Sequence, residues 1–161
     1  MRRLYGIGVM ALIAAISTTP VLAQKANFGN LTIAPGFPVG TARVTGSTGG
    51  NYSLPSIANS DHDKKPCIGF ASQTPDHILV LEKDFSNLAI QINSGGRDTT
   101  LLIKGPNNTI YCGDDTGLSK DASVEATNLK AGTYEIWVGS IEAGQRWNYI
   151  LTVREQPRRL R

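Results

Sequence analysis

The stretch Asp98-Thr-Thr-Leu-Leu-Ile-Lys-Gly-Pro106 decides the fold class, together with the residues that follow it as far as Val153. The chain continues through Cys112-Gly-Asp-Asp115, Gly132-Thr-Tyr-Glu-Ile-Trp-Val-Gly139 and Tyr149-Ile-Leu-Thr-Val153. Short runs rich in β-branched and aromatic residues alternate here with turn residues, which is the pattern of successive β-strands. We therefore expect a β-rich C-terminal half with acidic residues at the edges of its strands.

The same pattern extends toward the N-terminus, more weakly before Cys67. No window of helical length after residue 23 shows a three-to-four-residue apolar period. Strands about ten residues apart, separated by turns, predict an all-β fold, an antiparallel β-sandwich. The expected strands cover residues 27–33, 41–45, 67–71, 77–82, 88–92, 99–104, 109–112, 123–127, 133–138 and 147–153.

Two of these strands allow more detailed predictions. The turn at 105–108 joins residues 99–104 and 109–112 into a hairpin. In the strand at 133–138, side chains alternate between the two faces of the sheet. Tyr134 and Val138 are thus expected on the core face, and Trp137 on the opposite face.

The first 23 residues have the features of a secretory signal. Arginines at positions 2 and 3 precede an apolar run from Ile7 to Ile16, and Val21-Leu-Ala23 presents small side chains for cleavage before Gln24. The apolar run is too short to span a bilayer comfortably, so no transmembrane segment is expected after cleavage. We expect an exported protein, periplasmic or extracellular.

The remaining 138 residues suit one domain. Residues 24–66 read as a polar segment with edge strands, residues 67–155 as the sandwich core of the same domain, and residues 156–161 as a basic tail. Residues 24–157 hold 11 basic and 13 acidic side chains, a net charge of −2. A nucleic-acid-binding surface needs a basic stripe on the folded domain, so we expect no nucleic-acid partner.

The exported chain keeps two cysteines, Cys67 and Cys112. An oxidising compartment and an even count favour a disulfide between them. Such a bridge closes a loop of about 46 residues and adds roughly 4 kcal/mol of stability in the chain-entropy account. Free thiols or a metal site are the alternatives, but neither a Cys-x-x-Cys motif nor neighbouring histidine ligands support a metal.

Several of these motifs resemble the bacterial pre-peptidase C-terminal domain over residues 76–153. The first motif is an aspartate that enters a strand, Asp98–Ile103. The acidic pair Asp114-Asp115 follows, and the last two motifs are Gly132–Val138 and Tyr149–Val153. The resemblance implies a jelly-roll-like β-sandwich that accompanies a separate catalytic domain. Because no peptidase precedes the module here, it implies a secreted peptidase as a partner in trans.

Asp98, Asp114 and Asp115 are the best candidate site. If the hairpin forms, Asp98 and Asp114 lie at the same end of it. Converging carboxylates suit Ca²⁺, which takes six to eight oxygen ligands, and calcium binds some members of the family that the chain resembles. The alternative is that these aspartates only cap turns, since the 12-residue calcium loop is absent. No cofactor is required for the expected fold.

Other polar motifs are weaker candidates. Asp61-His62-Asp63 is expected in a solvated loop, because adjacent side chains point apart and do not converge on a metal. Asp76-His77 is expected as a capped turn followed by a half-buried imidazole. Trp137 is a candidate platform for sugar rings or peptide, against the alternative that a large aromatic is buried.

No catalytic constellation stands out, and the Gly-x-Ser-x-Gly elbow of many hydrolases is absent. We therefore expect a module that is not an enzyme and that binds an extracellular protein or polysaccharide. The alternatives are a structural or assembly subunit of a cell-envelope complex, and, with less support, a small hydrolase or a protease inhibitor. An exposed strand edge or an uncovered apolar patch would favour the assembly subunit.

Overall fold

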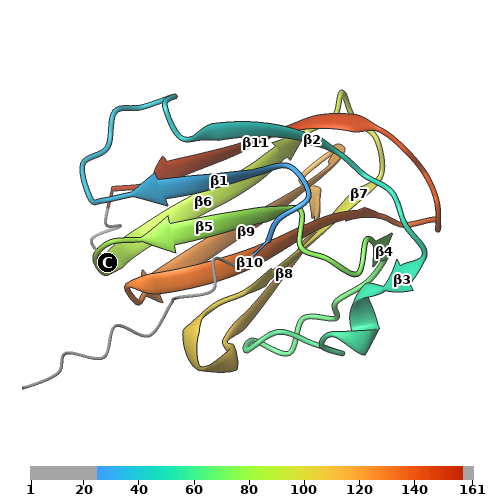
Figure 1. Ribbon diagram of the computed structural model, residues 1–161, viewed down its shortest axis with the longest axis horizontal. Helices are drawn as coiled ribbons and strands as arrows, with labels where there is room; N and C mark the ends of the chain where they lie inside the picture. Colours follow the sequence, from blue (N-terminus) through green and yellow to red (C-terminus); the bar gives the residue numbers. More distant parts are fainter. Residues whose placement is uncertain (1–24, 158–161) are drawn as a thin grey trace, which may run out of the picture.

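The computed structural model describes residues 25–157 (Figure 1). The predicted signal over residues 1–23 and the arginines of the basic tail at 158–161 lie outside the described residues. Within residues 25–157 the structure is built of strands, with two short 3-10 helices, η1 (Leu54–Ser56) and η2 (Pro106–Asn108). Neither helix of this part of the chain has the length and apolar character needed to cross a membrane.

The strands follow one another along the chain, and the longest connection lies between β3 and β4. They are β1 (Gly29–Ile33), β2 (Arg43–Ser47), β3 (Tyr52–Ser53), β4 (Phe70–Ala71), β5 (His77–Leu81), β6 (Phe85–Asn93), β7 (Thr99–Lys104), β8 (Ile110–Thr116), β9 (Ser119–Leu129), β10 (Gly132–Ser140) and β11 (Asn148–Glu155).

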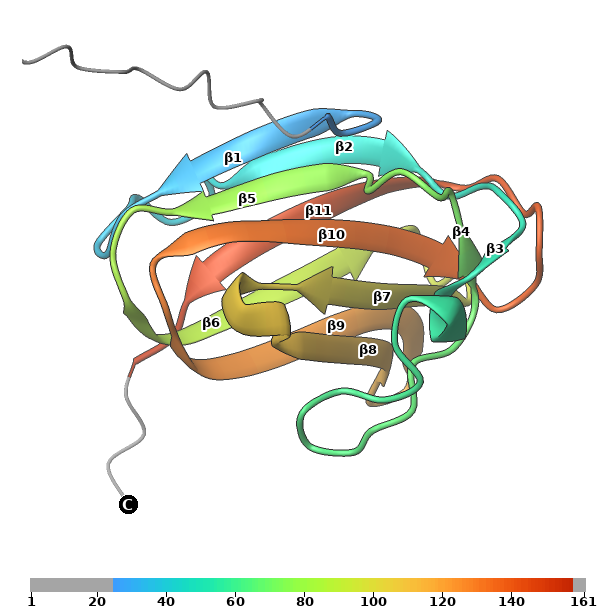
Figure 2. The same cartoon turned by 60° about the horizontal axis from the view of Figure 1, so that its bottom comes forward.

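Two layers of strands enclose the core. The order of paired strands is β1-β5-β10-β7-β8-β9-β6-β11-β2, with β3 and β4 added beside β10. Strand β8 belongs to both layers, because it pairs with β7 in its first half and with β9 in its second. The first and last strands of the order, β1 and β2, lie side by side, so the sheet is nearly closed on itself (Figure 2).

The expected all-β sandwich is confirmed, with one departure from an antiparallel arrangement. Strand β1 pairs with β5 in parallel, with Gly29 opposite His77 and Ile33 opposite Leu81. Each other pair in the order is antiparallel. A parallel pair needs a long connection, and here about forty residues, including β2 and the disulfide loop, separate the two strands.

The predicted alternation along β10 is confirmed and separates two apolar clusters. Tyr134 and Val138 point into the main core between the layers, and the core includes residues from β5, β6, β7, β9 and β11. Trp137 points to the other face, into a second cluster with Leu102 and the disulfide. Strand β10 is thus covered on both sides.

Strand boundaries differ from the predictions mainly at the ends. Residues 99–104 form β7 as predicted, whereas β6 and β9 are longer than the predicted 88–92 and 123–127. The strand expected at 41–45 begins at Arg43, because backbone bonds from Thr41 N to Pro38 O and from Arg43 N to Thr41 O keep the turn closed.

Candidate functional site

Asp98, Asp114 and Asp115 meet at one end of the β7–β8 hairpin, and we call this group the acidic corner. Asp98 precedes β7, and the pairing of Leu101 with Gly113 brings the two acidic residues of β8 to the same end. A register irregularity between Asp114 and Thr116 re-aims the side chains there. One carboxylate oxygen from each aspartate lies within 4.8 Å of the others.

Asp114 is a partly buried member of the acidic corner. Burial is the main cause that raises its pKa above the ordinary value, and the negative charges of Asp115 and Asp98 raise it further. Its Oδ1 atom is buried and has no hydrogen-bond partner. A buried carboxylate oxygen without a donor is costly, so the position favours a bound proton or a cation.

A lysine supplies part of the missing positive charge. Lys120 Nζ on β9 lies 2.9 Å from Asp98 Oδ2. The bond to Asp98, and then that residue's charge, raise the pKa of Lys120. The ammonium contacts Asp98, and neither carboxylate of β8 forms a salt bridge among the described residues.

The donor chemistry of the acidic corner fits a hard cation. Its side-chain donors are carboxylate oxygens, the ligand type that Ca²⁺ prefers, and one of these oxygens lacks any other partner. Backbone carbonyls and water would have to complete the six to eight ligands. Asp98, Asp114 and Asp115 are the residues that would hold such an ion.

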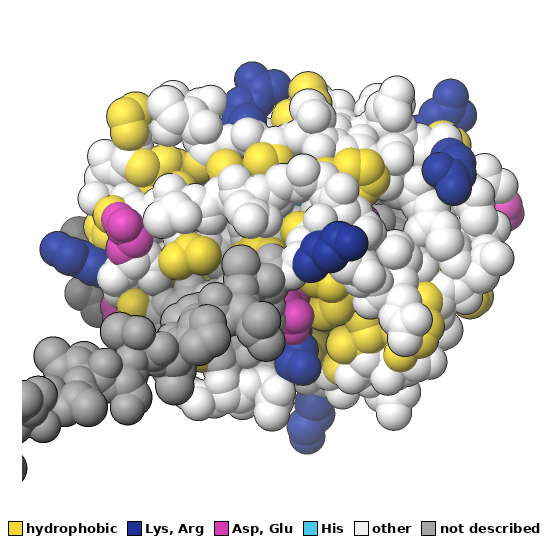
Figure 3. Space-filling view, viewed as in Figure 1, with side chains coloured by type: hydrophobic (Ala, Val, Ile, Leu, Met, Phe, Trp, Pro, Cys, Tyr) yellow, Lys and Arg dark blue, Asp and Glu magenta, His cyan; other side chains and the backbone are white. Residues whose placement is uncertain are grey.

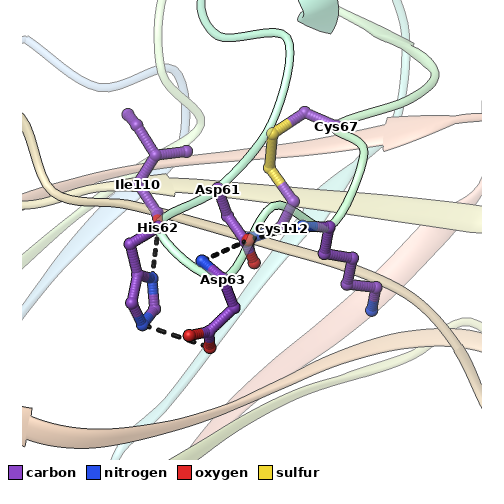
Figure 4. Close-up of a disulfide and its surroundings, with 7 residues drawn as sticks. Asp61, His62, Asp63, Cys67, Ile110 and Cys112 are labelled. Carbon is purple, nitrogen blue, oxygen red and sulfur yellow. Dashed lines mark hydrogen bonds and ion pairs between the residues drawn. A yellow bond between two sulfur atoms is a disulfide. The ribbon is translucent and has the colours of Figure 1, made fainter.

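The disulfide joins the long N-terminal loop to β8. Cys67 and Cys112 are bonded, with their Cα atoms 5.2 Å apart, as expected from the sequence (Figure 4). Asp61 shapes the loop, because its Oδ1 accepts bonds from the backbone N of Asp63 at 2.9 Å and of Lys65 at 2.8 Å. Its Oδ2 accepts a longer bond, 3.4 Å, from Cys112 N on β8.

The histidine of this loop has partners of its own. His62 Nδ1 lies 2.9 Å from the carbonyl oxygen of Ile110, and Nε2 lies 3.3 Å from Asp63 Oδ2 (Figure 4). The ring also contacts Tyr111 edge-on. The Asp61–Asp63 segment therefore acts as a loop docked on the edge of β8, close to the solvated loop expected from the sequence.

Asp76 and His77 are buried more deeply than expected. The imidazole of His77, expected half-buried, is 1% exposed. Its Nδ1 donates to Gly29 O at 3.1 Å, and its Nε2 accepts the hydroxyl hydrogen of Tyr149 at 2.8 Å. Burial lowers the pKa of His77, which agrees with a neutral ring in this tautomer.

Asp76 anchors the start of the described chain. Its carboxylate accepts bonds from Asn27 Nδ2 at 3.0 Å and from Val138 N at 2.8 Å. Burial raises its pKa to about 6, although both hydrogen bonds lower it in part. The sequence offered no signal for the Asn27–Asp76 contact, since the two residues lie far apart in the chain and the Asp76-His77 motif does not indicate a partner.

Trp137 lies beneath the disulfide loop. Its side chain is 5% exposed, and its indole N–H donates to Gln73 O at 3.3 Å. Cys67, Cys112 and Leu102 pack in the same cluster. In this structure the ring has no open face for a ligand, in line with the alternative of a buried aromatic.

Charge is dispersed over the face of the molecule seen in Figure 1. Most of that face is neither charged nor hydrophobic, and the lysine and arginine side chains are spread around it (Figure 3). This face therefore shows no continuous basic stripe of the kind that nucleic-acid binding requires.

The solved structures similar to this chain include the pre-peptidase C-terminal domain of collagenase from Bacillus anthracis, determined at 1.0 Å. The two share 15% sequence identity with a TM-score of 0.44, and the match covers 78% of this chain and 94% of that one. No family model and no curated protein matches the sequence. That domain is of the kind that the sequence motifs resemble.

Proposed function

We propose that this protein is an exported, non-catalytic β-sandwich module that binds an extracellular protein or polysaccharide and is stabilised by calcium at the acidic corner. The disulfide fits a domain that folds in an oxidising compartment. The observation that carries the calcium proposal is the convergence of three carboxylates around a buried oxygen of Asp114 that has no donor.

The partners of the nucleophilic and basic side chains support a non-catalytic role. Both cysteines form the disulfide, so neither provides a thiolate. His77 uses both ring nitrogens inside the core, and His62 uses both in the docked loop. These groups serve the fold, which leaves binding as the function that the geometry supports best.

A cation at the acidic corner would remove two unfavourable contributions to the free energy of folding. It would neutralise the mutual repulsion of the three carboxylates, and it would give the buried Oδ1 of Asp114 a partner. It would also connect the start of β7 to β8, two strands next to the point where β8 passes between the layers. Stabilisation of the fold follows, because the ion would bind only the folded arrangement.

Thermal melting of the oxidised protein at neutral pH tests the proposal. We expect a higher midpoint in millimolar Ca²⁺ than in excess chelator. A ligand at about 100 times its dissociation constant adds roughly 2.7 kcal/mol. The Asp114→Asn variant should lose the calcium effect, since the amide keeps the shape of the side chain but not its charge.

Glu82→Gln provides the matched control, because it removes one negative charge from an exposed side chain outside the acidic corner. It should keep the full calcium effect. A midpoint that is the same in calcium and in chelator would remove calcium from the proposal. An equal loss in both variants would show a general charge effect instead of a site.

A further inference from the structure

The outer face of the layer formed by β9, β6, β11 and β2 holds a shallow depression. Its volume is about 370 Å³, and its lining comes from β2, β6, β8, β9 and β11. The side chains of this face alternate with the core residues of the same strands. Uncharged polar groups and two arginines make up most of the lining.

One row of side chains in the depression makes no side-chain hydrogen bond or ion pair with the described residues. Gln91 on β6 pairs with Thr152 on β11, and Thr152 pairs with Arg43 on β2, so the three side chains stand in register across three strands. Each lacks a side-chain hydrogen bond or ion pair within residues 25–157. With strands spaced about 4.8 Å apart, the row spans roughly 10 Å.

Arg154 extends this row with a second positive charge. It lies two residues beyond Thr152 on β11, which places it on the same face and diagonal to Arg43, at about 7–8 Å between Cα atoms. No carboxylate of the described chain forms a salt bridge with either arginine. We call Gln91, Thr152, Arg43 and Arg154 the open row.

The polar groups around the open row form hydrogen bonds with neighbouring side chains and backbone groups. Thr116 Oγ1 donates to the carbonyl oxygen of Asp121 at 2.7 Å and lies 2.7 Å from Ser123 Oγ. The carboxylate of Asp121, the acidic group in the lining, accepts bonds from Ser94 N at 2.8 Å and from Gly96 N at 3.1 Å. Burial alone would raise the pKa of Asp121, but these bonds and those from the Ser94 and Ser119 hydroxyls lower it, so it stays ionised as a cap of the turn after β6.

Two neighbouring guanidinium groups repel each other, and an anion placed between them would bind to both. The amide and hydroxyl beside them suit hydroxyl groups of a ligand, whereas the lining contains no aromatic anchor of the kind that enriches protein–protein interfaces. From this combination we propose that the open row binds an acidic polysaccharide, with a carboxylate or sulfate of the sugar on the arginines and sugar hydroxyls on Gln91 and Thr152.

This proposal rests on the proposed function as a binding module and specifies its ligand class. The test is binding of the full oxidised protein to polygalacturonate, a uronic-acid polymer, with neutral dextran and poly-L-glutamate as comparison polymers. We expect binding to polygalacturonate that weakens as salt is raised, because exposed charge pairs are screened. Binding to dextran should be absent, and binding to polyglutamate should be weaker.

Variants then locate the site. The double variant Arg43→Gln/Arg154→Gln should lose about tenfold or more in affinity for polygalacturonate, which corresponds to about 1.4 kcal/mol. The double variant Lys64→Gln/Lys83→Gln removes the same charge from exposed positions outside the depression and should bind as the unaltered protein does. Both variants keep the arginines of the C-terminal tail.

Each of the remaining outcomes contradicts one part of the proposal: the site, the ligand class or polysaccharide binding itself. Equal losses in the two double variants, or dextran binding as tight as polygalacturonate binding, would contradict the open row while leaving a polysaccharide-binding module in place. Polyglutamate bound as tightly as polygalacturonate would move the ligand class to acidic protein segments. Failure to bind any of the three polymers overturns the polysaccharide inference, and the calcium melting experiment then tests the proposed function separately.

Discussion

Asp76 and His77 are neighbours whose burial changes stability in opposite directions with pH. The pKa of Asp76 is raised to about 6 from an ordinary 3.8, so the folded protein holds that proton more tightly than the unfolded chain does. Its contribution to stability is complete below about pH 4 and is lost as the pH rises through 6. The pKa of His77 is lowered, so its contribution is lost as the pH falls below the ordinary 6.5.

Substitution of Asp76 by asparagine isolates the first effect. At pH 4 both side chains are neutral in the folded protein, and the two proteins should differ by an offset that does not depend on pH, because an amide nitrogen replaces one of the two oxygens that accept from Asn27 and Val138. Between pH 4 and pH 7 the unaltered protein should lose up to about 3 kcal/mol relative to Asp76→Asn, since one pKa unit corresponds to about 1.4 kcal/mol. Urea unfolding at both pH values measures the difference, and a gap that does not change with pH would contradict the assignment.

Tyr149 supplies the hydrogen bond that holds the neutral form of His77. Tyr149→Phe leaves His77 Nε2 buried without a donor, which should cost about 1–3 kcal/mol in the free energy of unfolding. Tyr134→Phe is a matched comparison, because its hydroxyl donates to Lys130 O closer to the surface and water can replace it. Equal losses in the free energy of unfolding of the two variants would show that the Tyr149–His77 bond stabilises the fold no more than the Tyr134–Lys130 bond does.

At the scale of elements, the disulfide loop forms an outer layer over β7, β8 and β10. Cys67 and Cys112 close a 45-residue separation, and their cluster covers Trp137 and Leu102. The docked segment around Asp61 bonds to the edge of β8, which would otherwise present free backbone groups. The bridge therefore holds a loop in place whose own hydrogen bonds are mostly exposed.

Removal of the bridge should loosen this layer before the main core. The Cys67→Ser/Cys112→Ser variant is expected to lose up to about 4 kcal/mol of stability. Amide hydrogen exchange should rise first in residues 59–66 and in β4, while amides of β6 and β9 keep their protection. Uniform loss of protection across both layers would argue against a separate outer layer.

The elements differ in how far their sequence specified them. The β7–β8 hairpin, the faces of β10 and the disulfide were predictable, because turn residues, alternation and compartment are local or compositional signals. The convergence of the acidic corner followed from the same hairpin. The parallel β1–β5 pair and the Asn27–Asp76 bond were not predictable, because each depends on contacts between segments more than forty residues apart.

The open row also escaped prediction, for a physical reason. Gln91, Thr152 and Arg43 become neighbours only through the register of three strands, and each residue alone is an ordinary solvent-facing side chain. Trp137, in contrast, is a large side chain, and the alternation along β10 correctly predicted that it lies on the outer face of that strand. The loop that covers it, through the disulfide, could be placed only in the folded structure.

At the scale of the whole molecule, a nearly closed sheet separates two candidate surfaces. The acidic corner lies where β8 passes from one layer to the other, and the open row lies on the outer face of the β9-β6-β11-β2 layer. The first is suited to a cation that stabilises the fold, and the second to a ligand outside the cell. A module with this division should bind its polysaccharide through the open row even after Asp114→Asn removes calcium, provided that it stays folded.

Calcium binding at the acidic corner is the central claim, and titration calorimetry of the oxidised protein at pH 7.5 and at pH 5 tests it most directly. We expect one Ca²⁺ per chain at pH 7.5, binding that is weaker at pH 5 because protons compete more strongly for Asp114, whose pKa burial raises above the ordinary value, and no binding in Asp114→Asn. Absence of binding at pH 7.5, or binding that Asp114→Asn leaves unchanged, would contradict it.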